Sequence, residues 1–141
     1  MLRVEHRQMM RINGLIDDFA LYGEATDYLD FAATVESAIQ SKEPQTLQTA
    51  SRFHIEIACD TKSDELYTSL QNHDAEYSSL DDWEQRNTLR IWGNAPVLEH
   101  LHVFLRSFPE RGQGYSYISE YSEEHPYHLL SPQWRLHVQC S

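Results

Sequence analysis

The chain has 141 residues, and its 22 acidic residues against 11 basic ones give a formal net charge of −11. This length fits one domain, expected to span residues 1–141, and an apolar content of 40% suffices for one core. The negative charge repels phosphates and anionic lipids, which excludes nucleic acids and membrane surfaces as expected partners and favours cationic proteins. The sequence has neither an apolar run long enough to span a membrane nor the apolar core of a signal peptide at residues 1–10, so we expect a cytoplasmic protein.

The first fifty residues predict one strand followed by one helix. Residues 1–10 have no clear period and form either an extension or an added edge strand. A strand is expected within Arg11–Tyr22, with a bend or bulge at Asp17–Asp18. Thr26 is a suitable N-cap for a helix that ends near Ser41, and Gln45–Ser51 is expected to be a polar connector. The buried stripe of this helix is expected to consist of Tyr28, Phe31, Ala32, Val35, Ala38 and Ile39.

A second strand is predicted at Phe53–Cys59, where apolar and polar residues alternate. Residues 60–87 connect it to the next strand, and this connection is longer than a hairpin needs. Eight acidic residues but only one basic residue, Lys62, occur between Asp60 and Glu84. We therefore interpret 60–87 as an acidic surface insertion, with a short helix at Ser63–Leu70. Its large apolar residues either dock the segment on the sheet or present an aromatic binding surface.

The stretch Thr88–Phe108 has the pattern of a strand–turn–helix unit. Apolar and polar residues alternate in its first five positions, which is typical of a strand with one buried face. Gly93 then ends the strand, and Asn94 or Ala95 caps a helix that has Pro96 in its first turn. The apolar face of this helix is expected to consist of Val97, Leu98, Leu101, Phe104, Leu105 and Phe108.

The same strand–glycine–helix pattern occurs 70 residues earlier, where Phe19–Gly23 aligns with Leu89–Gly93. An alternating segment follows each helix, Phe53–Cys59 in the first half and Tyr115–Tyr121 in the second, and a further strand is expected at Trp134–Cys140. Two tandem βαβ halves predict one sheet with both helices on one face. The expected fold is therefore α+β, a ferredoxin-like two-layer sandwich with an added C-terminal strand.

The sequence contains no pattern typical of a catalytic or cofactor site. His100 and His102 are two positions apart on one helix and point in different directions, which prevents them from sharing a metal ion. The two histidines of the segment EHPYH have loop spacing, but no second pair of ligands accompanies them. Cys59 precedes Asp60, whose charge should raise the pKa of the thiol and make it a poor nucleophile. We therefore expect no metal, no cofactor and no enzymatic activity.

The C-terminal segment EYSEEHPYHLLSPQWRLHV, together with the two strand–glycine–helix units, resembles a family of small bacterial α+β proteins. These are predicted immunity proteins of polymorphic toxin systems, and the resemblance extends from about Met10 to Val138. It implies that the chain acts by binding a toxin, without catalytic residues, and many toxins of these systems are nucleases with cationic clefts. The most specific positions of the segment are Glu120, Tyr121, His125, Pro126, Tyr127, Leu130, Ser131, Pro132, Leu136 and Val138.

The negative charge and the resemblance together predict a protein that neutralises a cationic, nuclease-like toxin. Acidic residues of the 60–87 segment would steer the partner towards the surface, and aromatic residues among them would act as anchors. The expected partner-binding residues are Asp64, Glu65, Tyr67, Asp74, Glu76, Tyr77, Asp81, Asp82, Trp83 and Glu84.

Two other classes of function remain open. A ferredoxin-like domain can bind a small molecule or act as an enzyme through its open sheet face, where Tyr115, Tyr117 and Tyr121 would line a pocket. The chain can also be a structural subunit of a larger assembly. The sequence contains no pattern that predicts an oligomeric state.

Overall fold

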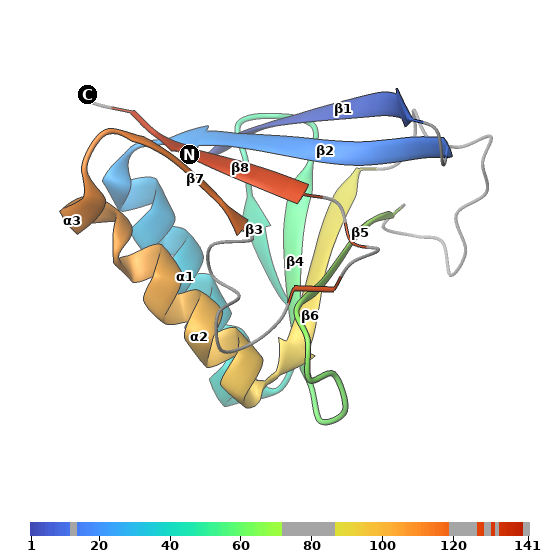
Figure 1. The fold of residues 1–141 in the computed structure, drawn as a ribbon. Coiled ribbons are helices and arrows are strands. Elements are labelled where there is room, and N and C mark those ends of the chain that lie inside the picture. The colour runs from blue at the N-terminus through green and yellow to red at the C-terminus, as the bar shows by residue number, and fades with distance from the viewer. Residues whose placement is uncertain (12–13, 72–86, 119–126, 129–130, 132, 140–141) are drawn as a thin grey trace.

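The computed structural model describes residues 1–11, 14–71, 87–118, 127–128, 131 and 133–139. Within these residues the chain forms eight strands and three helices (Figure 1). None of these helices has the length and apolar character needed to cross a bilayer. The elements in chain order are β1 (Arg3–Arg11), β2 (Gly14–Gly23), α1 (Ala25–Ser41), β3 (Gln45–Gln48), β4 (His54–Asp60), β5 (Tyr67–Gln71), β6 (Thr88–Asn94), α2 (Ala95–Arg106), α3 (Phe108–Arg111), β7 (Gly114–Tyr117) and β8 (Gln133–Val138).

The described strands form two four-stranded sheets, and each sheet takes one antiparallel pair from each half of the chain. The first sheet has the order β1-β2-β8-β7, and the second sheet has the order β3-β4-β6-β5. The two central strands of each sheet are parallel, whereas each edge strand is antiparallel to its neighbour. The chain is therefore a tandem repeat of a ββαββ unit, in which β1 to β4 flank α1 and β5 to β8 flank α2.

The α+β class predicted from the sequence is confirmed, but the strands do not form the single sheet expected of a ferredoxin-like sandwich. Each helix leaves one sheet and leads to the other: α1 runs from the first sheet to the second, and α2 runs from the second to the first. The repeated unit also contains strands that the sequence reading missed. β3 lies within the expected connector Gln45–Ser51, and β5 replaces the short helix expected at Ser63–Leu70.

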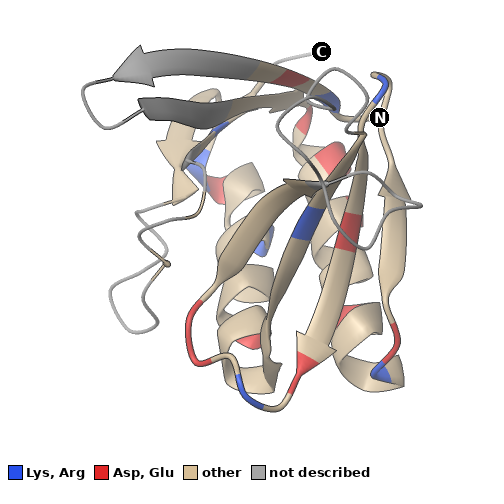
Figure 2. Cartoon of the chain, turned by 90° about the vertical axis from the view of Figure 1, so that its right-hand side faces the viewer, with Lys and Arg blue, Asp and Glu red and all other residues tan. Residues whose placement is uncertain are grey.

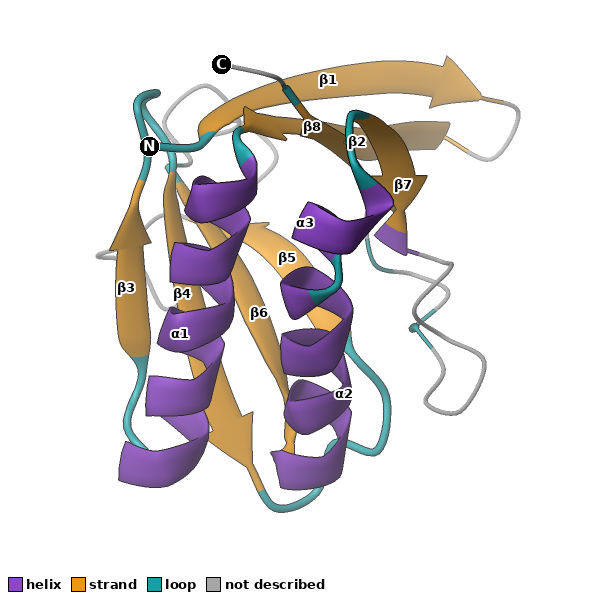
Figure 3. Cartoon of the chain, turned by 90° about the vertical axis from the view of Figure 1, so that its left-hand side faces the viewer, coloured by secondary structure: helices purple, strands orange, loops and turns teal. Residues whose placement is uncertain are grey.

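Both long helices lie side by side on one face of the second sheet, and the first sheet lies across one end of this layer (Figures 1 and 3). One continuous cluster of buried apolar side chains contains residues of the helices and of both sheets. The apolar stripes predicted for the helices are confirmed. In α1 the fully buried residues are Tyr28, Phe31, Ala32, Val35 and Ala38, and Ile39 packs at the edge of the cluster. In the second half they are Val97, Leu98, Leu101 and Leu105 of α2 and Phe108 of α3, and Phe104 is almost fully buried.

Two local predictions in the first half are wrong. The N-cap of α1 is Glu24 rather than Thr26, because the Oδ2 atom of Asp27 accepts the backbone N–H of Glu24 at 2.9 Å and fixes the first turn there. The bend or bulge expected at Asp17–Asp18 is absent from the backbone, since β1 and β2 pair in one unbroken antiparallel register.

The second helix begins as predicted but ends earlier. Asn94 is its N-cap, and the Oδ1 atom of Asn94 accepts the backbone N–H of Val97 at 3.1 Å. The helix ends at Arg106, and a separate single turn, α3, follows it. Pro109 has no N–H with which to continue the hydrogen-bond ladder to the carbonyl of Leu105, which explains why one long helix does not form.

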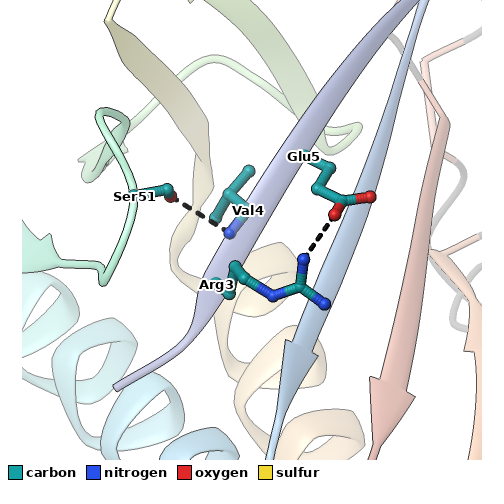
Figure 4. A network of polar contacts seen from close by, with 4 residues as sticks. All are labelled: Arg3, Val4, Glu5 and Ser51. Atoms are coloured by element: carbon teal, nitrogen blue, oxygen red, sulfur yellow. Dashed lines mark hydrogen bonds and ion pairs between the residues drawn. The ribbon is translucent and has the colours of Figure 1, made fainter.

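Edge strand β1 of the first sheet is also held by the connection between β3 and β4. The Oγ atom of Ser51 accepts the backbone N–H of Val4 at 3.1 Å, as Figure 4 shows. The backbone N–H of Ala50 donates to the carbonyl of Leu2 at 2.7 Å. Because an edge strand presents unpaired backbone groups, these bonds both cover part of that edge and join the first sheet to the second.

Candidate functional site

The candidate site is the outer face of the second sheet, which is turned away from the helices. The apolar residues of β4 and β6 that face the helices are buried, and side chains alternate along a strand, so their neighbours point outward. The strand registers bring these neighbours together. Glu56 of β4 lies beside Arg90 of β6, and Trp92 of β6 lies between Ala58 and Tyr67.

Aromatic rings are stacked at one edge of this face. The rings of Tyr67 and Trp92 are nearly parallel, with centroids 5.5 Å apart and an angle of 9° between their planes. The ring of His128 lies 4.4 Å from that of Tyr67, and its Nδ1 atom is 2.7 Å from the Oε2 atom of Glu65. The backbone N–H of His128 donates to the carbonyl of Leu66 at 3.0 Å. A segment near the C-terminus is thus fixed against the start of β5.

A shallow pocket of about 300 Å³ lies beside the stacked rings. Its wall contains an ion pair, in which the Nε atom of Arg90 is 3.2 Å from the Oε1 atom of Glu56. The described residues that line the pocket are Glu56, Ala58, Arg90, Ile91 and Trp92. A side chain that enters it therefore meets an indole ring, a carboxylate and a guanidinium group.

The turn after β4 is held by the carboxylate of Asp60. Its Oδ1 atom accepts the backbone N–H groups of Lys62 at 3.0 Å and Ser63 at 2.8 Å, and its Oδ2 atom accepts the hydroxyl of Ser63 at 2.5 Å. Burial alone would raise the pKa of Asp60, but these hydrogen bonds outweigh it and lower the pKa. The backbone N–H of Asn94 closes the turn by donating to the carbonyl of Ser63 at 2.8 Å. The negative charge at this turn is therefore fixed in position.

The electrostatic environment of the face is negative at the end near this turn. Desolvation raises the pKa of Tyr67, and the charges of Glu65, Asp64 and Asp60 raise it further. Figure 2 looks onto this face and shows acidic residues on the turn that follows β4, with one basic residue among them. This arrangement favours cations over anions near the stacked rings.

Three of the ten predicted partner-binding residues lie within the described part of the chain. Asp64 is exposed, Glu65 is bound to His128, and Tyr67 is stacked on Trp92. Part of the expected insertion is built into the second sheet, because Tyr67–Gln71 form β5, which pairs along β6. The other predicted residues lie outside the described residues; they are Asp74, Glu76, Tyr77, Asp81, Asp82, Trp83 and Glu84.

Sequence reasoning missed four members of the site: Glu56, Arg90, Trp92 and His128. The period-two patterns of the two central strands already place Glu56, Arg90 and Trp92 on the face opposite the core. Only the parallel register of β4 and β6 makes Glu56 and Arg90 neighbours. No local sequence pattern indicates that His128 belongs to the site, because its contact with Glu65 joins residues 63 positions apart in the sequence.

The outer face of the first sheet carries a second aromatic group. The strand registers align Arg3, Tyr22, His137 and Tyr115 in one row across the four strands. The rings of Tyr22 and His137 stack at 4.6 Å, and the guanidinium of Arg3 lies 4.3 Å from the centre of the Tyr22 ring. Tyr115 and Tyr117, predicted to line an open sheet face, are 59% and 41% exposed on this surface. Tyr121, predicted with them, lies outside the described residues.

The thiol of Cys59 behaves as predicted. Burial raises its pKa and the charge of Asp60 raises it further, while Lys42 opposes the shift. Its side chain packs at the edge of the core, which fits a structural residue. Cys140 lies outside the described residues.

Comparison of the chain with protein-family models, curated proteins and solved structures finds no significant match.

Proposed function

We propose that this protein binds a cationic protein partner on the outer face of the second sheet and neutralises it, in the manner of an immunity protein that inhibits a toxin. The net charge of −11 and the resemblance to immunity proteins support this proposal. The observation that carries it is the juxtaposition of the Tyr67–Trp92 stack, the pocket beside it and the acidic turn at 60–65.

The chemistry of the pocket suits an arginine or lysine side chain of the partner. The indole face of Trp92 attracts a cation, and this attraction is worth ~0.5–2 kcal/mol, more where water is excluded. The carboxylate of Glu56 can accept a charge-assisted hydrogen bond from the incoming cation while it remains beside Arg90. Aromatic residues surrounded by polar groups are also the side chains that most often dominate protein interfaces.

Charge then affects the rate of association. A strongly acidic protein and a basic partner attract each other before contact, which can raise the association rate constant ~10–10³-fold at low salt. The acidic turn lies next to the aromatic anchors, so the approach would be directed to the pocket. Added salt should slow association, because exposed charges are screened over ~8 Å at physiological ionic strength.

The test begins with isolation of the partner from the native host and continues with surface-plasmon kinetics on the purified pair. Trp92→Ala should increase the dissociation rate at least about tenfold, as expected for loss of a central anchor. Glu56→Gln should weaken binding through the same pocket. Tyr115→Ala is the matched control, because Tyr115 is an exposed aromatic residue on the other sheet.

Two results would contradict the proposal. One is a partner whose affinity is unchanged by Trp92→Ala and Glu56→Gln while Tyr115→Ala abolishes it, because the first sheet would then be the interface. The other is an association rate that does not depend on salt. Thermal melting of each variant shows whether the fold is intact.

The first sheet supports a second candidate function, the binding of a small ring-containing ligand. The row of Arg3, Tyr22, His137 and Tyr115 offers aromatic rings, of which that of Tyr115 is exposed, and a guanidinium group on one face of the sheet. Such groups bind planar ligands by stacking. Titration with aromatic carboxylates, followed by tyrosine fluorescence of the wild type and Tyr115→Ala, would detect this activity.

A further inference from the structure

Three metal-ligating side chains meet on the helical layer, far from the candidate binding face. Glu36 belongs to α1, and Glu99 and His102 belong to α2, where their spacing of three residues places them on one side of the helix. The Nδ1 atom of His102 lies 3.5 Å from the Oε1 atom of Glu99 and 3.6 Å from the Oε2 atom of Glu36. The three ligand atoms all lie within 4.8 Å of one another.

The facing atoms of this cluster are buried and make no hydrogen bond among the described residues. This holds for the Oε2 atom of Glu36 and for the Nδ1 atom of His102. The other carboxylate oxygen of Glu36 accepts the amide of Gln40 at 3.1 Å, which leaves Oε2 directed at His102. A buried polar atom without a partner is costly, so a group that binds both atoms would stabilise the pair.

The distances fit a metal ion better than a direct hydrogen bond. Nitrogen–oxygen hydrogen bonds are ~2.7–3.2 Å long, and both contacts of His102 exceed this range. Nitrogen and oxygen ligands bound to Zn²⁺ at ~2.0–2.2 Å lie about 3.3–3.6 Å from each other around a tetrahedral ion. The separations of 3.5 and 3.6 Å correspond to two such edges.

The helices that carry these ligands are firmly placed. α1 and α2 pack side by side, and Val35 and Leu101, each next in sequence to a ligand, are fully buried. Glu36 comes from the first ββαββ unit, and Glu99 and His102 come from the second. An ion bound here would therefore bridge the two halves of the repeat at a site whose backbone is held by the core.

We propose that Glu36, Glu99 and His102 bind one divalent transition-metal ion of the Zn²⁺ type. One imidazole nitrogen and two carboxylate oxygens suit Zn²⁺, Co²⁺ or Mn²⁺, and the two carboxylates balance the charge of the ion. Glu99 is 53% exposed, so solvent reaches the cluster from that side. Three protein ligands with a position open to water is the arrangement of zinc sites that react or exchange ligands, not of closed structural sites. The protein needs neither the proposed partner nor the pocket of the second sheet for this binding.

The spacing of histidines along the sequence does not indicate this cluster. His102 does not share a site with His100, and its facing groups are instead a glutamate three residues earlier and a glutamate on the other helix. Only the packing of α1 against α2 shows the third ligand.

The experiment uses the full chain, purified with chelator and then dialysed, with Zn²⁺ added in a calorimetric titration. We expect one ion to bind per chain and to raise the melting temperature. His102→Gln and Glu36→Gln should each weaken binding at least about tenfold, since loss of even an outer-sphere partner of a metal site costs ~10–100-fold. Glu99→Gln should weaken it too, and because Glu99 is half exposed this variant keeps the fold. Co²⁺ should give visible absorption of a four- or five-coordinate ion in the wild type.

Two controls separate this site from adventitious binding by the other histidines. His100→Gln removes a histidine two residues away on the same helix, and Glu110→Gln removes an exposed glutamate outside the cluster. Both should bind Zn²⁺ as the wild type does. The proposal is overturned if the wild type binds no ion, because the three side chains would then interact only with one another. It is equally overturned if Zn²⁺ binding survives Glu99→Gln and the other two ligand variants unchanged.

Discussion

Substitution of Tyr28 by phenylalanine tests how the two halves of the chain are joined. Tyr28 of α1 is fully buried, and its hydroxyl lies 2.6 Å from the carbonyl of His137 and 3.0 Å from the carbonyl of Leu21. These carbonyls belong to β8 and β2, the parallel central pair of the first sheet, to which each half contributes one strand. Burial, together with the charge of Asp27, raises the pKa of Tyr28, so the hydroxyl remains a donor throughout the ordinary pH range.

The expected loss of stability follows from the single group that Tyr28→Phe removes, the buried hydroxyl. The ring stays, with its edge-to-face contact to Phe108 at 4.8 Å, so no large cavity forms. A neutral hydrogen bond contributes ~0.5–1.5 kcal/mol net, and a buried acceptor left without its donor costs ~1–3 kcal/mol. We therefore expect the free energy of unfolding to fall by about 1–3 kcal/mol, a noticeable share of the ~5–15 kcal/mol typical of a domain.

Urea unfolding followed by far-ultraviolet circular dichroism measures this loss. Tyr115→Phe is the matched control, because it removes the same hydroxyl from a side chain that is 59% exposed, and it should change stability by less than ~0.5 kcal/mol. A loss below ~0.5 kcal/mol for Tyr28→Phe at an unchanged m-value would refute the reasoning. An equal loss in both variants would refute it as well, since burial would then make no difference.

Three further predictions concern single residues. Gly93→Ala should lower the free energy of unfolding by ~1–3 kcal/mol in urea titration, because the added Cβ would lie 2.7 Å from the Cγ1 atom of Val97. Gly23→Ala should cost a similar amount, because its Cβ would lie 2.6 Å from the Cδ2 atom of the buried Leu2 and 3.1 Å from the Cβ atom of Asp27. Burial and the charge of Arg135 lower the pKa of His137, so the unfolded chain takes up a proton at this residue more readily than the folded chain does. The free energy of unfolding should therefore fall as the pH drops below ~6.5, the ordinary pKa of histidine. His137→Gln should reduce that loss in urea titrations at several pH values. Alkylation of Cys59 by iodoacetamide, followed by peptide mass spectrometry, should require a higher pH than an ordinary thiol needs, and Asp60→Asn should shift its rate profile to lower pH.

Much of the fold could be predicted from the sequence because it depends on local periodicity. The apolar stripes of both helices and the buried faces of β4 and β6 follow directly from spacings of three to four and of two residues. The prediction that Gly23 and Gly93 occupy equivalent positions of the repeat, at the ends of β2 and β6, is also confirmed. Both positions require glycine for the same reason, because a Cβ at Gly23 or Gly93 would lie within 2.7 Å of a side chain of the core.

What the sequence could not predict depends on pairing between distant segments. β3 and β5 are edge strands of four and five residues with few apolar side chains, so their pattern resembles that of a connector. The division into two sheets follows from β2 pairing with β8 rather than with β4, and no local pattern encodes that choice. The ion pair of Glu56 with Arg90 and the contact of Glu65 with His128 could not be predicted either, because they too depend on pairing between distant segments.

The exchange of strand pairs between the halves leads to a last prediction about folding. Each ββαββ unit alone would have two separate two-stranded pairs, each lacking its central parallel neighbour, and such pairs are at best marginally stable in water. Its helix would also leave uncovered the residues that contact the other helix. A chain divided between Thr61 and Lys62, both exposed, should therefore give two fragments that are unfolded separately and that form a folded 1:1 complex when mixed. Circular dichroism and analytical ultracentrifugation measure this, and cooperative unfolding of fragment 1–61 as a monomer would show that the halves are independent domains. If the complex forms, the two units are one cooperative domain, because the central strands of each sheet come from both.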